Sequence, residues 1–135
     1  MTLSQFLARW YDRYCEFDHI GSAQCVDLAE QYVADVLRLP KIGGNAADVW
    51  NRVDPLRYLR TVNGPTNFPL PGDIVVWFQN TSVGVGPAGH VGICVGADQD
   101  SLVTFDQNWP ALSRCKCVLH SYTGVYGWLS TPGTH

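Results

Sequence analysis

The feature that most restricts the fold is a change of hydrophobic period near residue 69. Before it, apolar residues recur at three- and four-residue spacing, which is typical of amphipathic helices. After the turn sequence PLPGD at 69–73, short apolar runs are separated by turn residues, which is typical of strands. Helices followed by strands give an α+β order. The sequence therefore predicts N-terminal helices packed on an antiparallel β-sheet of about five to six strands.

These patterns also predict the individual elements. Helices are expected at 3–14, 24–38 and 46–51, and strands at 74–78, 89–96, 102–108, 115–122 and 125–130. Pro40 ends the second helix, and the segment from 54 to 65 has a less regular pattern. With 135 residues, of which 46% are hydrophobic, one compact domain is expected.

Charge and hydropathy argue against two classes of partner. The charged fraction is 16% and the formal net charge is −3, so no basic field exists to attract nucleic acid or anionic lipid. Charged residues (Arg9, Asp12 and Arg13) interrupt the first apolar segment, which argues against a signal peptide. No stretch reaches the ~18 apolar residues that a membrane span needs. We expect a monomer made in the cytoplasm, with no nucleic-acid binding and no membrane insertion.

The five cysteines do not form a disulfide framework of the secreted type. Their number is odd and their spacing irregular, so at least one thiol is free in any monomeric pairing scheme. Cys115 and Cys117 form C-x-C, and no second Cys/His pair has zinc-finger spacing. We interpret them as strand residues rather than metal ligands.

Cys25 lies at the start of a predicted helix. A thiol attacks an amide only as a thiolate, which is favoured at the positive end of a helix dipole beside an imidazolium. Most cysteines at buried helix starts are inert packing groups, so catalysis also needs a base on another rigid element. The residues alone leave both interpretations open.

Four histidines are candidates for that base. His135 and His19 have no rigid support, because one is the last residue and the other lies in a loop. His120 lies near the end of a strand, where a surface or half-buried histidine is the more ordinary interpretation. His90 opens a strand after the flexible sequence VGVGPAG, which allows close approach. His90 is the better candidate.

A third group must orient the imidazole, and the next strand offers two. Asp106 and Asn108 alternate with Gln107, so an extended strand directs both toward one face, which can be the face of His90. Each residue alone is more often a turn former. Either one can orient the ring.

Four ordered motifs resemble the CHAP family, the cysteine, histidine-dependent amidohydrolases/peptidases. They are AQCVDLAEQY around Cys25, PLPGDIVVW at 69–77, GHVGICVG at 89–96 and FDQNW at 105–109. The resemblance extends from about Trp10 to Trp128. It implies a papain-like fold, with residues 1–130 as a single CHAP-like catalytic domain. The closing residues STPGTH are typical of a frayed end, so we expect 131–135 to form a flexible tail.

The resemblance also implies an activity. CHAP domains of phage endolysins, virion-associated lysins and autolysins cut peptidoglycan as N-acetylmuramoyl-L-alanine amidases or as endopeptidases, through a thioester. The sequence does not choose between these two bonds. We expect a chain made in the host cytoplasm that acts on the wall after release or from the virion. The alternatives are a non-catalytic wall-binding module and a cysteine hydrolase of non-wall amides.

By position, the resemblance assigns roles to individual residues. Cys25 is the nucleophile and His90 the general base. Asp106 falls where the family often has Glu and would orient His90, while Asn108 completes the cluster. The side chain of Gln24, or the backbone N–H of Cys25, would help stabilise the oxyanion. Trp109 would line the cleft.

Residues 16–27 form a twelve-residue acidic loop with EF-hand-like spacing. Its predicted calcium ligands are Glu16, Asp18, Ile20, Ser22 and Asp27, with Gly21 at the sharp turn. Some phage CHAP domains have a similar loop ahead of the cysteine. The alternative is an acidic N-cap region, in which Asp27 favours the first helical turn.

Overall fold

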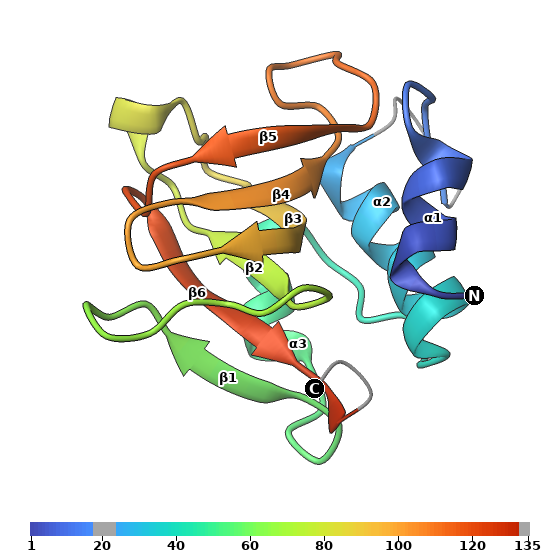
Figure 1. The fold of residues 1–135 in the computed structure, drawn as a ribbon, viewed down its shortest axis with the longest axis horizontal. Coiled ribbons are helices and arrows are strands. Elements are labelled where there is room, and N and C mark those ends of the chain that lie inside the picture. Colours follow the sequence, from blue (N-terminus) through green and yellow to red (C-terminus); the bar gives the residue numbers. More distant parts are fainter. Residues whose placement is uncertain (18–23, 133–135) are drawn as a thin grey trace.

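The computed structural model describes residues 1–17 and 24–132, and it contains a helical layer packed against a curved sheet (Figure 1). The helices are α1 (Leu3–Trp10), α2 (Cys25–Tyr32) and α3 (Ala46–Arg52), with a π-helical turn η1 (Val33–Leu37) and a 3₁₀ turn η2 (Thr81–Val83). The strands are β1 (Leu59–Val62), β2 (Ile74–Trp77), β3 (His90–Ala97), β4 (Leu102–Asp106), β5 (Lys116–His120) and β6 (Val125–Ser130). The predicted α+β class is confirmed.

The first two helices begin and end at residues whose backbone explains the boundary. Thr2 caps α1, because its hydroxyl accepts from the N–H of Gln5. That helix ends at Trp10 rather than at residue 14, and Asp12 beyond it has a φ of 60°. η1 continues α2 until Arg38, whose φ is 56°. None of the helices in the described ranges is both long and apolar enough to cross a bilayer.

The sheet has six antiparallel strands in the order β1-β6-β2-β3-β4-β5. The strand β1 lies in the segment that we predicted to be irregular, and that prediction was wrong. β1 is an edge strand that pairs only with β6, and its side chains are half or fully exposed. An edge strand with no buried face needs no apolar alternation, so the sequence pattern gives no signal.

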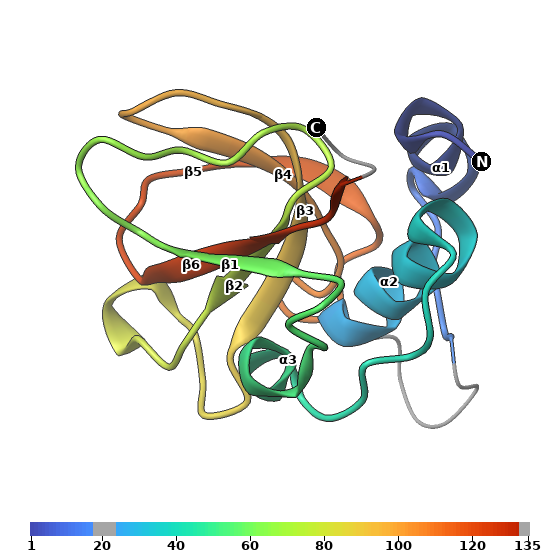
Figure 2. The same ribbon diagram turned by 90° about the horizontal axis from the view of Figure 1, so that it is seen from below.

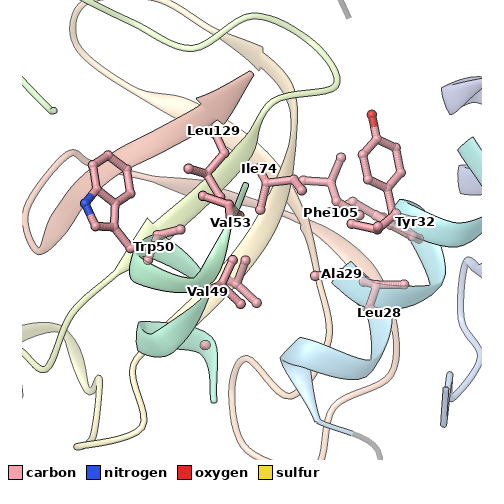
Figure 3. Packing of buried hydrophobic residues seen from close by; sticks show 14 of the residues in the cluster. Leu28, Ala29, Tyr32, Val49, Trp50, Val53, Ile74, Phe105 and Leu129 are labelled. Atoms are coloured by element: carbon pink, nitrogen blue, oxygen red, sulfur yellow. The ribbon is translucent and has the colours of Figure 1, made fainter. Parts of the chain in front are cut away.

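Alternate residues of the central strands point to opposite faces of the sheet. Ile74 of β2 and Phe105 of β4 face the helices, where they join Leu28 and Tyr32 of α2 in the main core (Figure 3). Phe6 of α1 packs edge-on against Tyr32 and Phe105, at centroid distances of 5.4 and 6.4 Å. α2 packs on β3 and α3 packs on β2 and β3 (Figure 2). The N-terminus of α2 is thereby fixed relative to the sheet.

The other face of the sheet is concave, so that side chains of strands that are not neighbours meet on it. The ring of Trp77 on β2 lies 4.9 Å from the ring of His120 on β5, although β3 and β4 lie between these strands. A flat sheet would separate β2 and β5 by roughly 14 Å, so strong curvature is required for this contact. The concave face therefore brings together side chains from strands that are not neighbours.

Packing continues past the predicted domain end at residue 130. Thr131, which we assigned to the tail, is 7% exposed. Residues 133–135, which make up the rest of the predicted tail, lie outside the described residues.

Candidate active site

Cys25 is the first residue of α2 and is half-buried. Gln24 before it is the N-cap, and its backbone N–H donates to Oδ2 of Asp27 at 2.8 Å. The carboxylate of Asp27 thus satisfies a backbone donor that the helix itself leaves without a partner. Because Cys25 is the first residue of α2, its thiol lies at the positive end of the helix dipole, as the sequence predicted.

A buried amide, Gln107, holds the segment that leads into Cys25. The Gln107 side chain has no exposed surface, and its Nε2 donates to the carbonyl oxygens of Gln24 at 2.7 Å and Cys15 at 2.8 Å. Its Oε1 accepts from the N–H of Cys15 at 2.6 Å. This role of Gln107 was not predicted from the sequence. The motif FDQNW at 105–109 did carry a signal for it. Alternation along an extended chain directs the polar side chain of Gln107 toward the helix side of the sheet, where a buried polar group needs hydrogen-bond partners.

His90 opens β3 beside Cys25, and Asp106 lies behind it. His90 Nε2 lies 3.0 Å from Oδ1 of Asp106, and the two side chains are 5% and 0% exposed. An ionised carboxylate can only accept hydrogen bonds, so the hydrogen of this bond is on Nε2. The remaining ring nitrogen of His90, Nδ1, is then the one available to Cys25.

The pKa values of this pair depart from the ordinary ones in opposite directions. Burial lowers the pKa of His90, but hydrogen bonds with Asp106 and Cys25 and the negative charges of both outweigh burial and raise it to about 9. Burial raises the pKa of Asp106, but hydrogen bonds from His120 and His90 outweigh it and lower that pKa below its ordinary value. Near neutral pH the site therefore holds an imidazolium beside the Cys25 sulfur.

The other four cysteines lack such an environment. Cys15, Cys94 and Cys115 are buried, and burial raises the pKa of each to about 12. Cys117 is exposed on β5, as the strand interpretation predicted, and Cys115 directly precedes that strand. Cys25 is the cysteine that lines a cleft together with a histidine.

That cleft has a volume of about 490 Å³. Its lining residues are 24–26, 45–46, 83–90 and 108–111. The ring of Trp109 lies 4.5 Å from that of His90, so this predicted cleft residue stands directly beside the histidine. A larger cavity of about 710 Å³, lined by residues of β1 and β6, has no cysteine or histidine in its wall.

Asp106, rather than Asn108, contacts His90. β4 ends at Asp106, and Asn108 has a φ of 63°, so the alternation that predicted a shared face does not continue. Asn108 Nδ2 lies 3.4 Å from Oε1 of Gln24, and its Oδ1 accepts from the N–H of Leu112 at 2.5 Å. Asn108 therefore lies in the cleft wall and braces the loop that follows it.

His120, which the sequence did not predict as a site residue, also contacts Asp106. It is 8% exposed, and its Nε2 lies 2.7 Å from Oδ2 of Asp106. Its ring lies 4.9 Å from Trp77 and 4.8 Å from Trp109. In the strand register Asp106 pairs with Lys116, four residues before His120. Strand pairing alone does not predict the contact, because His120 pairs with Leu102 and not with Asp106.

The calcium hypothesis falls mostly outside the described residues. Asp18, Ile20 and Ser22 lie in the segment 18–23, which the structure does not describe. Glu16 is exposed, and Asp27 is 5% exposed with Oδ2 bonded to the N–H of Gln24. Within residues 1–17 and 24–132, no group of three His, Cys, Asp or Glu side chains is arranged to hold a metal ion. Calcium binding stays a prediction.

A cysteine at a helix start, a histidine on the adjacent strand and a buried acid behind it define the papain-like class of α+β domains. The chain belongs to the CHAP domain family, because the model of that family matches residues 15–108.

Known proteins extend this similarity. Endolysin PlyTW of Staphylococcus phage Twort is 30% identical over 120 residues, which are 82% of this chain and 25% of the relative. The chain thus spans about a quarter of the length of that relative. The crystal structure of endolysin LysIME-EF1 matches with a TM-score of 0.81 and 23% identity over 98% of this chain and 65% of the other. The structure of Ly7917 with the hydrolyzing product of MDP matches with a TM-score of 0.71 and 18% identity, over 97% and 63%. These two structures support the fold.

Gly92 on β3 provides a test of the His90–Asp106 contact. A Cβ at this position would lie 2.1 Å from Oδ1 of Asp106, so Gly92→Ala must displace the carboxylate. We expect the pKa of His90, measured by ¹H–¹⁵N NMR titration, to fall from about 9 to its ordinary value or below it. Gly96→Ala on the same strand is the matched control, since a Cβ there meets nothing within 4 Å. An unchanged pKa in Gly92→Ala would contradict the assigned contact.

Proposed function

We propose that this chain cleaves an amide bond in the peptide part of bacterial peptidoglycan, through a thioester on Cys25. The observation that carries the proposal is the arrangement of Cys25 and His90 in one cleft of a CHAP domain, with Asp106 buried behind His90. The relative named an endolysin favours the cell wall as target. A phage endolysin or a virion-associated lysin, made in the host cytoplasm and acting on the wall after release or from the virion, fits this activity.

The geometry supports a two-stage reaction. In the first stage the Cys25 thiolate attacks the amide carbonyl carbon, and the imidazolium of His90 gives its proton to the leaving amine as the C–N bond breaks. In the second stage His90 takes a proton from water, which attacks the thioester carbonyl carbon. The C–S bond breaks, releasing the carboxylic acid and restoring the Cys25 thiolate beside the His90 imidazolium. Asp106 keeps Nδ1 of His90 directed at the sulfur and stabilises the imidazolium.

The tetrahedral intermediates carry a negative oxygen that needs hydrogen-bond donors. The backbone N–H of Cys25 at the helix start and the side chain of Gln24 border the cleft beside the sulfur. We propose these groups as the oxyanion site. Trp109 and the loop 83–89 form other parts of the wall and would contact the peptide or sugar. Whether the bond is that of an N-acetylmuramoyl-L-alanine amidase or of an endopeptidase depends on these contacts.

The two alternative functions are a non-catalytic wall-binding module and a cysteine hydrolase of non-wall amides. A non-catalytic wall-binding module has no need of a buried, charged Asp106 behind a histidine, because burying a carboxylate costs several kcal/mol unless it is well paired. A cysteine hydrolase of non-wall amides would use the same three residues. Fragment analysis after digestion of peptidoglycan separates this last function from the proposed one.

Substitution of the nucleophile or the base tests the proposal. We expect Cys25→Ala and His90→Ala to lower the clearing of suspended Gram-positive cell walls by more than about 10³-fold, because members of a catalytic triad act as a unit. Mass spectrometry of fragments from purified peptidoglycan identifies the bond. Cys117→Ala, at an exposed cysteine, is the matched control and should retain activity. Folded Cys25→Ala protein that still releases fragments would refute the proposal.

The pKa of His90 predicts an alkaline limit to activity. Because this pKa is raised to about 9, the imidazolium that protonates the leaving amine is lost as pH rises through that value. The stability that protonated His90 contributes is complete below its ordinary pKa of 6.5 and is also lost toward pH 9, so circular dichroism must show that the fold persists. We expect the rate of wall digestion to fall near pH 9, and near a lower pH in Asp106→Asn. Identical alkaline limits in the two proteins would contradict the assigned role of Asp106.

Calcium binding by the loop 16–27 is also proposed, since a bound ion there would brace the start of α2. Addition of millimolar calcium to chelator-treated protein should raise the melting temperature, because an ion that binds the folded state stabilises it. Magnesium at equal concentration and the Asp18→Asn variant are the controls. The absence of any shift with calcium would remove this hypothesis.

A further inference from the structure

We propose that His120 is a positioning residue for the reaction, which it serves by holding Asp106 in the orientation that directs His90 toward Cys25. The proposal rests on the proposed function, because it assigns a role within the same site. His120 is not among the residues that line the cleft, so it acts through Asp106 rather than on the substrate.

The two oxygens of Asp106 have separate partners. Oδ1 bonds His90 Nε2 at 3.0 Å, while Oδ2 bonds His120 Nε2 at 2.7 Å and accepts from the Thr104 hydroxyl at 2.8 Å. The terminal torsion of an aspartate is broad, so one hydrogen bond does not fix the carboxylate plane. Partners on both oxygens do fix it. His120, with the shorter of the two bonds to Oδ2, and Thr104 therefore together determine which way Oδ1 points.

Aromatic rings hold His120 in place. Trp77 lies 4.9 Å from both histidine rings, and Trp109 lies 4.5 Å from His90 and 4.8 Å from His120. Trp77 is 1% exposed and belongs to the second hydrophobic cluster of the sheet. The imidazole of His120 thus approaches Asp106 from a site whose walls restrict its rotation.

The burial of Asp106 makes the second histidine important. With a side chain that has no exposed surface, Asp106 must obtain its donors from protein side chains. Without His120, the Thr104 hydroxyl would be the one remaining donor to Oδ2 within the described residues. A buried carboxylate that loses a charge-assisted hydrogen bond is expected to rotate toward another donor or to become protonated. Either change weakens its hold on His90.

The test compares variants at this position. In His120→Gln the amide Nε2 can replace the imidazole Nε2 as a donor to Asp106, whereas His120→Leu has no donor and His120→Asn has a shorter reach. The first readout is the rate at which iodoacetamide alkylates Cys25 at pH 7, with the modified residue identified by peptide mass spectrometry. This readout measures the thiolate of Cys25 without any substrate.

We expect His120→Leu to slow the alkylation of Cys25 by about tenfold or more and to slow wall digestion in parallel. The magnitude is taken by analogy from metal sites, where replacing a residue that hydrogen-bonds to a ligating side chain has an effect of about this size. His120→Gln should remain within about threefold of the wild type, because it keeps the donor. Leu119→Gln, at the neighbouring residue of β5 that is 70% exposed, is the control for changes to the strand and should alkylate normally. If His120→Leu does not fold, His120→Asn takes its place in the comparison with His120→Gln.

Equal alkylation rates in the wild type and a folded His120→Leu would overturn the proposal, as would an equal loss in His120→Gln and His120→Leu. Rapid alkylation of the wild type without release of wall fragments would instead refute the proposed function. In that case the dependence of Cys25 reactivity on His120 would still stand.

Discussion

The buried charge of Asp106 is the constraint on which the rest of this site depends. A carboxylate in the interior costs several kcal/mol in lost hydration, and only well-placed donors offset that cost. Three side chains supply them, from β3, β4 and β5. The absence of a side chain at Gly92 leaves the room in which Oδ1 approaches His90. Strand order, sheet curvature and one glycine are thus all required for a single ionised group.

The end of β4 fixes the base and the nucleophile together. Asp106 and Gln107 are consecutive, so they point to opposite faces of the sheet. On the concave face Asp106 orients His90, and on the helix side Gln107 holds the carbonyl oxygen of Gln24, one residue before Cys25. The two reacting groups come from elements 65 positions apart in the sequence (90 − 25). The last residue of β4 and the residue that follows it therefore hold the two reacting groups near each other, while the core beneath α2 keeps the helix in place.

The parts of this arrangement that follow local rules could be predicted from the sequence. Periodicity and turn residues predicted the α+β class and five of the strands, four of which (β2, β3, β4 and β6) have buried faces. The motif order led to Cys25, His90 and Asp106. Long-range geometry could not be predicted in this way. β1 has no buried face, the left-handed backbone of Asn108 ends the alternation, and His120 contacts Asp106 although the two are not paired in the strand register.

The chemistry and the choice of substrate depend on different parts of the fold. The groups that prepare the reaction lie on strands and at a helix start, where burial and paired hydrogen bonds fix them. The wall of the cleft is made largely by the connections at 83–89 and 108–111. Loops tolerate changes of sequence that a buried ion pair does not, because they contribute little to the core. Under the proposed function, the same pair of groups can therefore serve cleavage of different amide bonds, with the loops determining which bond reaches Cys25. For this reason candidate catalytic residues can be inferred from motifs, whereas the bond must be identified by chemical analysis of the products.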